Sequence, residues 1–173
     1  MKRPILGLCA ALAITSPSVA APGLRACDVK LNVTDPDPAG LNVRAEPAGR
    51  VIGTLRAKNQ WVQVHVTGDA GGWMRIDGAT LYDDALPEGE KTVFTGVGFV
   101  STGMLGTETL NGRARLLAEA RDDARLLYQA PDDTDKAPMV QVLGCSGGFL
   151  QLRVGKITGW TRGFCSNQRT TCV

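Results

Sequence analysis

Histidine and aromatic residues are scarce in this sequence of 173 residues. It holds one histidine, His65, and only 5% of its residues are aromatic. Catalytic metal centres and His-dependent hydrolases need His, Cys and carboxylate side chains in sets, and the sequence shows no dense cluster of them. We therefore expect neither enzymatic activity nor a cofactor.

An excess of charge of one sign is also missing. Lys and Arg number 19, against 17 Asp and Glu. Two of the basic residues, Lys2 and Arg3, lie in a segment that resembles a removable leader, and without them the two signs balance. Nucleic acid and anionic lipid are bound through basic surfaces, so neither is expected as the main partner.

The first 20 residues have the pattern of a signal peptide. Lys2 and Arg3 precede an apolar run from Ile5 to Ile14, and Ser18 and Ala20 supply the small residues of a cleavage site. The run is too short to cross a bilayer, and no later segment has the length or apolarity of a membrane span. We predict cleavage after Ala20 and a periplasmic or secreted protein.

Four cysteines follow the predicted leader: Cys27, Cys145, Cys165 and Cys172. An even number of cysteines in an oxidising compartment favours two disulfides. Four cysteines allow three pairings, and the sequence does not select one. A zinc site is disfavoured because the paired C-x-x-C spacing is missing.

Short alternating segments predict an all-β protein. Val62, Val64 and Val66 alternate with polar or exposed-type residues, and so do Leu150, Leu152 and Val154. Period-two patterns with frequent Gly and Pro turn signals are typical of small barrels and sandwiches.

The alternating pattern occurs twice. Residues 62–64 and then 71–76 (VQV, GGWMRI) are echoed by residues 140–142 and then 147–152 (VQV, GGFLQL). Both copies place a large aromatic residue directly after a Gly-Gly turn. A self-similar sequence predicts two copies of one structural unit.

Residues 113–130 allow two interpretations. The segment is rich in Ala, Arg and Leu, which are good helix formers, and Leu116, Ala120, Ala124 and Leu127 would share one helical face. The repeat instead predicts a strand at about 114–119, a loop, and a strand at about 124–129. We favour the repeat because one repeated unit should have one fold.

The motifs of the first copy resemble those of the bacterial SH3 (SH3b) domain family. Leu41-Asn42-Val43-Arg44-Ala45-Glu46-Pro47 is similar to the opening LNVR-x-x-P strand of that family, and Val51–Leu55 (VIGTL) to the segment that follows it. Residues 62–64, 72–76 and 98–100 are similar to its later strands, although Phe99 stands where the family usually has Trp.

The resemblance implies two small SH3-like barrels in tandem, stapled by disulfides. We expect a first SH3b-like domain over residues 24–108, with an inserted acidic loop at 77–95, and a second, degenerate one over 112–173 with a Cys-containing tail. The second copy lacks a clean LNVR-x-x-P motif. Two such units occupy nearly all of the predicted mature chain and leave no room for a hydrolase domain.

A small barrel has little room for a buried ligand, so the ligand should bind in a surface groove. Trp61 alternates with Val62 and should face outward, and Tyr82 lies in the expected insertion; aromatic rings offer contact area at low entropic cost. Arg44 could pair with a carboxylate of a peptide ligand, or form a surface ion pair. Trp73 and Phe149 open equivalent strands, which favours a place in the core.

These observations and the resemblance lead to two hypotheses. The first is a non-catalytic exported binding module that recognises cell-wall peptide or glycan through Trp61, Tyr82 and Arg44. The second is an adaptor or inhibitor that binds another exported protein, for which the acidic residues of the 77–95 segment would be presented to a basic partner.

Overall fold

The computed structural model describes residues 23–57, 60–107, 109–110, 114–131 and 139–166. The predicted signal peptide (1–20) and Cys172 lie outside these residues. Apart from one short 3-10 turn, η1 (Thr102–Met104), every regular element among them is a β-strand. No helix in this part of the chain is long and apolar enough to cross a membrane.

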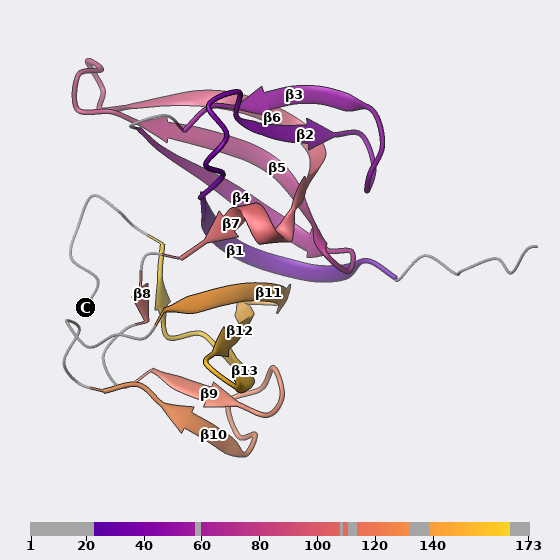
Figure 1. Cartoon of the computed structure of the whole chain (residues 1–173), viewed down its shortest axis with the longest axis vertical. Coiled ribbons are helices and arrows are strands. Elements are labelled where there is room, and N and C mark those ends of the chain that lie inside the picture. The colour runs from indigo at the N-terminus through magenta and orange to yellow at the C-terminus, as the bar shows by residue number, and fades with distance from the viewer. Residues whose placement is uncertain (1–22, 58–59, 108, 111–113, 132–138, 167–173) are drawn as a thin grey trace, which may run out of the picture.

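The first half of the chain forms a seven-stranded antiparallel sheet (Figure 1). The strand order is β3-β2-β6-β5-β4-β1-β7. The strands are β1 (Arg25–Val33), β2 (Leu41–Arg44), β3 (Val51–Leu55), β4 (Trp61–Asp69), β5 (Trp73–Tyr82), β6 (Glu90–Ser101) and β7 (Leu105–Gly106).

The second half forms a five-stranded sheet with the order β10-β9-β13-β12-β11. A separate pair, β8 (Thr109–Leu110) with β14 (Phe164–Cys165), joins the start of this half to its end. The strands of the five-stranded sheet are β9 (Arg115–Leu117), β10 (Leu126–Gln129), β11 (Val140–Ser146), β12 (Phe149–Val154) and β13 (Ile157–Thr161).

The two sheets repeat one strand order. The sequence β3-β2-β6-β5-β4 in the first matches β10-β9-β13-β12-β11 in the second, strand for strand along the chain. The loops correspond as well: Ala45 N–H donates to Arg50 O, and Ala118 N–H donates to Arg125 O, both at 2.9 Å. The strand–loop–strand interpretation of residues 113–130 is thereby confirmed, since β9 and β10 form where local propensity favoured a helix.

The alternation seen in the sequence becomes burial on one side of each sheet. Val62, Val64 and Val66 are at most 1% exposed, and Leu150 and Leu152 are fully buried. These side chains belong to one continuous apolar cluster that includes residues of both sheets. Burial of apolar surface is the main stabilising term in folding, so the two sheets share a stabilising core.

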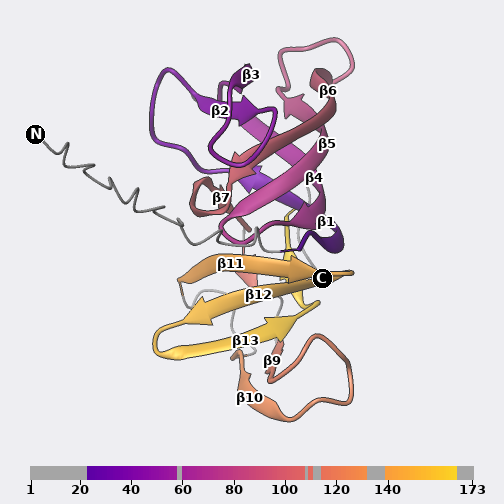
Figure 2. The same ribbon diagram turned by 90° about the vertical axis from the view of Figure 1, so that its right-hand side faces the viewer.

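A disulfide and two hydrogen bonds fasten the sheets together where β1 runs beside β11 (Figures 1 and 2). Cys27 is bonded to Cys145, with the Cα atoms 5.8 Å apart. Asp28 N–H donates to Gly147 O, and Gly147 N–H donates to Ala26 O, both at 2.8 Å. The prediction of an all-β, disulfide-stapled fold is therefore confirmed, and the two small barrels expected in tandem correspond to the two sheets. Cys165 is disulfide-bonded too.

A buried carboxylate completes this junction. Asp69, at the end of β4, accepts a hydrogen bond from Gly71 N–H at 2.9 Å and one from Cys145 N–H at 3.3 Å. Arg25 lies 3.6 Å from the same carboxylate. Asp69 is only 6% exposed, so its charge is compensated by groups from both sheets.

The expected insertion at residues 77–95 is not a loop. Residues 77–82 continue β5 and residues 90–95 belong to β6, so that only residues 83–89 connect the two strands. Pairing of Ala79 with Phe94 and of Leu81 with Lys91 extends the hairpin. The register shift between Ile76 and Gly78 changes the inward parity of β5, so that Ala79 and Leu81 pack against the core. The equivalent β12–β13 connection is short, so this long arm belongs to the first sheet alone.

Strand β1 was not anticipated from the sequence. Its inward residues Cys27, Val29, Leu31 and Val33 do alternate. This alternating segment lies upstream of the LNVR motif, and the second copy contains no segment that corresponds to it. β1 pairs with β4 and thereby extends the first sheet toward the second.

Candidate functional site

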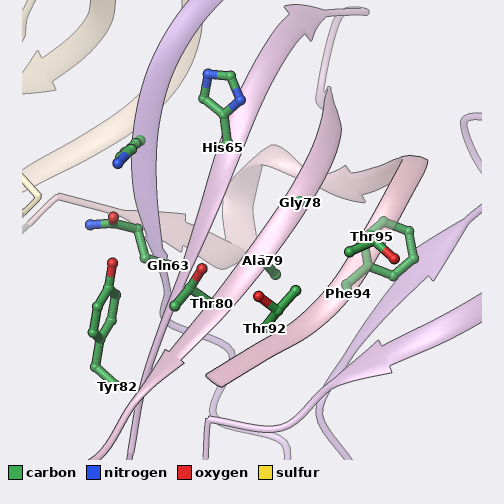
Figure 3. Close-up of a pocket in the computed structure, with 10 residues that line it drawn as sticks. Gln63, His65, Gly78, Ala79, Thr80, Tyr82, Thr92, Phe94 and Thr95 are labelled. Carbon is green, nitrogen blue, oxygen red and sulfur yellow. The ribbon is translucent and has the colours of Figure 1, made fainter. Parts of the chain in front are cut away.

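A shallow pocket of about 300 Å³ lies on the first sheet, over β1, β4, β5 and β6 (Figure 3). Its size is at the lower end of the range for ligand sites. The lining combines hydroxyl, amide, imidazole and ammonium groups with the aromatic ring of Tyr82, and its residues are Lys30, Gln63, His65, Gly78, Ala79, Thr80, Tyr82, Thr92, Phe94 and Thr95.

Strand register brings the polar lining together. Residues directly opposite one another on neighbouring strands share a face of a sheet. Three such rows cross β4, β5 and β6, and they are His65–Gly78–Thr95, Gln63–Thr80–Thr92 and Trp61–Tyr82–Glu90. We call these three rows the polar face; the opposite side of the same strands packs into the core.

Trp61 and Tyr82, two of the predicted site residues, are cross-strand partners at one end of the polar face. Trp61 is 47% exposed, in agreement with the outward parity expected for it. Tyr82 is half-buried and lines the pocket. Aromatic neighbours on adjacent strands form a continuous contact surface.

Arg44, the third predicted residue, is not part of this face. Its guanidinium donates to Gly49 O at 2.7 Å and lies 5.9 Å from the centre of the Trp73 ring. β2 meets β6 at the pair Arg44–Phe99, beyond the pocket. Both contacts of Arg44 order the first sheet, and neither is the surface ion pair considered as the alternative.

Of the two aromatic residues that open the repeated strands, Phe149 lies in a buried cluster as expected, whereas Trp73 belongs to neither core cluster. Phe149 is buried and Trp73 is half-buried. Each carries a guanidinium on its ring, Arg162 at 4.2 Å from the centre of Phe149 and Arg44 on Trp73. Such cation–π contacts stabilise partly exposed rings.

His65, at the other end of the polar face from Tyr82, is held between two carboxylates. Its Nδ1 lies 2.7 Å from Asp77 Oδ1 and its Nε2 lies 3.0 Å from Asp28 Oδ1. The hydrogen bond to Asp28, supported by Asp77, raises the pKa of the His65 imidazole above 6.5, although partial burial opposes this. With both ring nitrogens engaged, His65 acts as a fixed wall of the pocket.

Sequence reasoning missed this bridge and the pocket. The outward parity of His65 was visible, but its carboxylate partners come from β1 and β5, 37 and 12 residues away. The sequence also holds a G-x-S-x-G spacing, Gly144-Cys145-Ser146-Gly147-Gly148. The nucleophile elbow with that spacing needs a strand-to-helix turn, whereas Ser146 ends β11 and leads into the hairpin with β12.

The segment that follows β14 also reaches the polar face. Gln63 Nε2 donates to Ser166 O at 2.5 Å, and Thr107 Oγ1 donates to Cys165 O. Among the residues whose positions are described, no three His, Cys, Asp or Glu side chains gather as they would around a metal ion.

The chain was compared with family models, curated proteins and solved structures. No family model matches it, and no curated protein matches it. A solved structure, NlpC2 from Trichomonas vaginalis, is similar over 84% of this chain with 13% identity and a TM-score of 0.34. The chain spans about half the length of that protein.

Proposed function

We propose that the protein is a non-catalytic, exported binding module of SH3b type that recognises cell-wall peptide or glycan. The observation that carries this proposal is the pocket on the polar face, with Trp61 and Tyr82 paired at one end. Concave sites with aromatic rings and a few polar groups are the usual form of small-ligand sites. The motifs on β2 and β3 and the repeated strand order support the SH3b assignment, and the disulfides suit a periplasmic or secreted protein.

Binding to purified sacculi tests the proposal. The protein should sediment with sacculi, and Trp61→Ala and Tyr82→Ala should each reduce the bound fraction. Leu126→Ala is the matched control, because Leu126 is also exposed (42%) but lies on β10 in the other sheet. Equal binding by all four proteins would exclude the polar face as the site.

The adaptor or inhibitor hypothesis has one observation in its favour. The connection between β5 and β6 projects from the sheet (Figure 1) and carries Asp83, Asp84 and Glu88. A projecting acidic tip suits a basic partner surface. If the protein fails to sediment with sacculi, this hypothesis takes precedence, and crosslinking in the native envelope should capture an exported protein through the tip.

A further inference from the structure

On β4 and β5 the pocket offers a ligand side chains and little backbone. Peptides commonly bind to sheets by strand addition, which needs free N–H and C=O groups at an edge. β4 and β5 are interior strands of the first sheet, and β4 is paired with β1 and β5 over the pocket, at Lys30–His65 and His65–Gly78. The backbone groups of β4 and β5 are therefore used in the ladders, and a peptide added as a strand could pair only with the outer edge of β6, which meets β2 at Arg44–Phe99.

The side chains suit a sugar ring. Thr80, Thr92 and Thr95 line the pocket with hydroxyl groups, and no hydrogen bond to another described side chain or backbone atom occupies them. Hydroxyls can donate and accept, as the hydroxyls of a hexose require. The ring of Tyr82 offers an aromatic surface at the end of the same pocket (Figure 3), and sugar C–H faces pack on such rings.

Gly78 leaves a notch in the first row of the polar face, between His65 and Thr95. Its backbone does not have a positive φ, and a Cβ at this position would meet only Phe94 O, at 3.8 Å. Packing thus does not require glycine here, whereas the register shift between Ile76 and Gly78 is a bulge of the kind that glycine often marks. A glycine inside a strand can also mark the close approach of a ligand, and the notch beside the Phe94 carbonyl has room for a small apolar group such as a methyl.

We infer that the pocket binds one N-acetylhexosamine ring of a glycan chain, with the acetamido methyl in the Gly78 notch and the next sugar against Trp61. The inference rests on the proposed function and selects glycan over peptide. Trp61 adjoins Tyr82 across the β4–β5 ladder and is 47% exposed, so the contact surface continues past the pocket by one further ring.

Calorimetric titration with defined ligands tests the inference. The probes are N-acetylglucosamine, its tetramer, peptide-free glycan strands from peptidoglycan, and the free stem peptide. We expect saturable binding of the tetramer and of the strands, weaker binding of the monomer and none of the peptide. Trp61→Ala should remove the advantage of the tetramer over the monomer.

Two variants of the pocket give the decisive comparison. Gly78→Leu fills the notch and should weaken tetramer binding at least about tenfold, the effect of losing one good contact. Gly103→Leu is the control, since a Cβ there meets only Ser101 Oγ at 4.0 Å, outside the pocket. Thr80→Val, which removes one hydroxyl and keeps the side-chain shape, should also weaken binding and tests the pocket if Gly78→Leu does not fold.

The outcomes separate the inference from the proposed function. Binding of sacculi and stem peptide without binding of either glycan overturns the inference and leaves the proposed function standing. Unchanged tetramer binding by a folded Gly78→Leu or Thr80→Val protein overturns the assignment to this pocket. Binding of the tetramer alone, without sacculi or strands, supports the ring site and overturns the cell-wall function.

Discussion

Loss of the Cys27–Cys145 disulfide should cost the protein much of its stability. The two cysteines are 118 residues apart in sequence, so the bond removes a large amount of entropy from the unfolded chain. In the loop-entropy description, a closed loop of that size corresponds to about 5 kcal/mol. Single-domain proteins are typically stable by only about 5–15 kcal/mol, so the loss would be a large fraction of the total.

The perturbation to use is the double variant Cys27→Ala/Cys145→Ala, measured by urea denaturation. Chemical reduction is unsuitable because Cys165 is disulfide-bonded as well and would be affected together with this pair. Cys145 is fully buried, and its Sγ lies 3.6 Å from Met74 Sδ. Cys27→Ala/Cys145→Val, which refills that space, therefore separates the effect of packing from that of the cross-link and should lose nearly as much stability.

The native protein should unfold in one cooperative transition, since the two sheets share an apolar cluster. A loss of less than about 1 kcal/mol in both double variants would refute the predicted contribution of the disulfide, because the cross-link would then add almost nothing to the stability of the docked sheets. Two separate transitions in the native protein would contradict the shared core.

Two further predictions concern the junction and the polar face. Gly144→Ala should destabilise the protein by about 1–3 kcal/mol in denaturation experiments, because the new Cβ would lie 2.6 Å from Asp69 Oδ2. Gly148→Ala is the control and should be nearly neutral, because the nearest atom to its new Cβ would lie at 3.9 Å. Equal losses of stability in the two variants would contradict this prediction. NMR titration should give the single histidine, His65, a pKa above 6.5, and Asp28→Asn should lower this pKa. Because the pKa is raised in the folded protein, the ion pairs of His65 add to the free energy of unfolding below pH 6.5. This contribution is lost as the pH rises through the folded-state pKa. A pKa at or below 6.5 in the native protein would exclude the carboxylate bridge.

Much of the fold could be predicted from the sequence because it depends on local patterns. Alternation over residues 62–66 and 150–154 gave both the strands and the side that each residue faces, since the side-chain period of a strand is two. The outward position of Trp61 followed from the same parity. For residues 113–130, local propensity favoured a helix, and only the comparison of the two copies indicated the strands that form.

The candidate site was determined by tertiary structure. The notch depends on register, because shifts in the ladders near Ile76 and Gly78 align His65, Gly78 and Thr95 in one row. The alternation in one strand does not show where its ladder with the next strand contains a bulge. The same limit explains Arg44, whose motif was recognised but whose partners Gly49 and Trp73 were not.

The cysteines show most simply which properties follow from the sequence and which depend on the tertiary structure. The sequence by itself determined that four cysteines follow the predicted leader and that an oxidising compartment would pair them. Which ones pair depends on the packing of β1 beside β11, which brings the Cα atoms of Cys27 and Cys145 to 5.8 Å. That approach is set by apolar burial and backbone hydrogen bonds between segments over 100 residues apart, a cooperative property of the whole chain rather than of any segment.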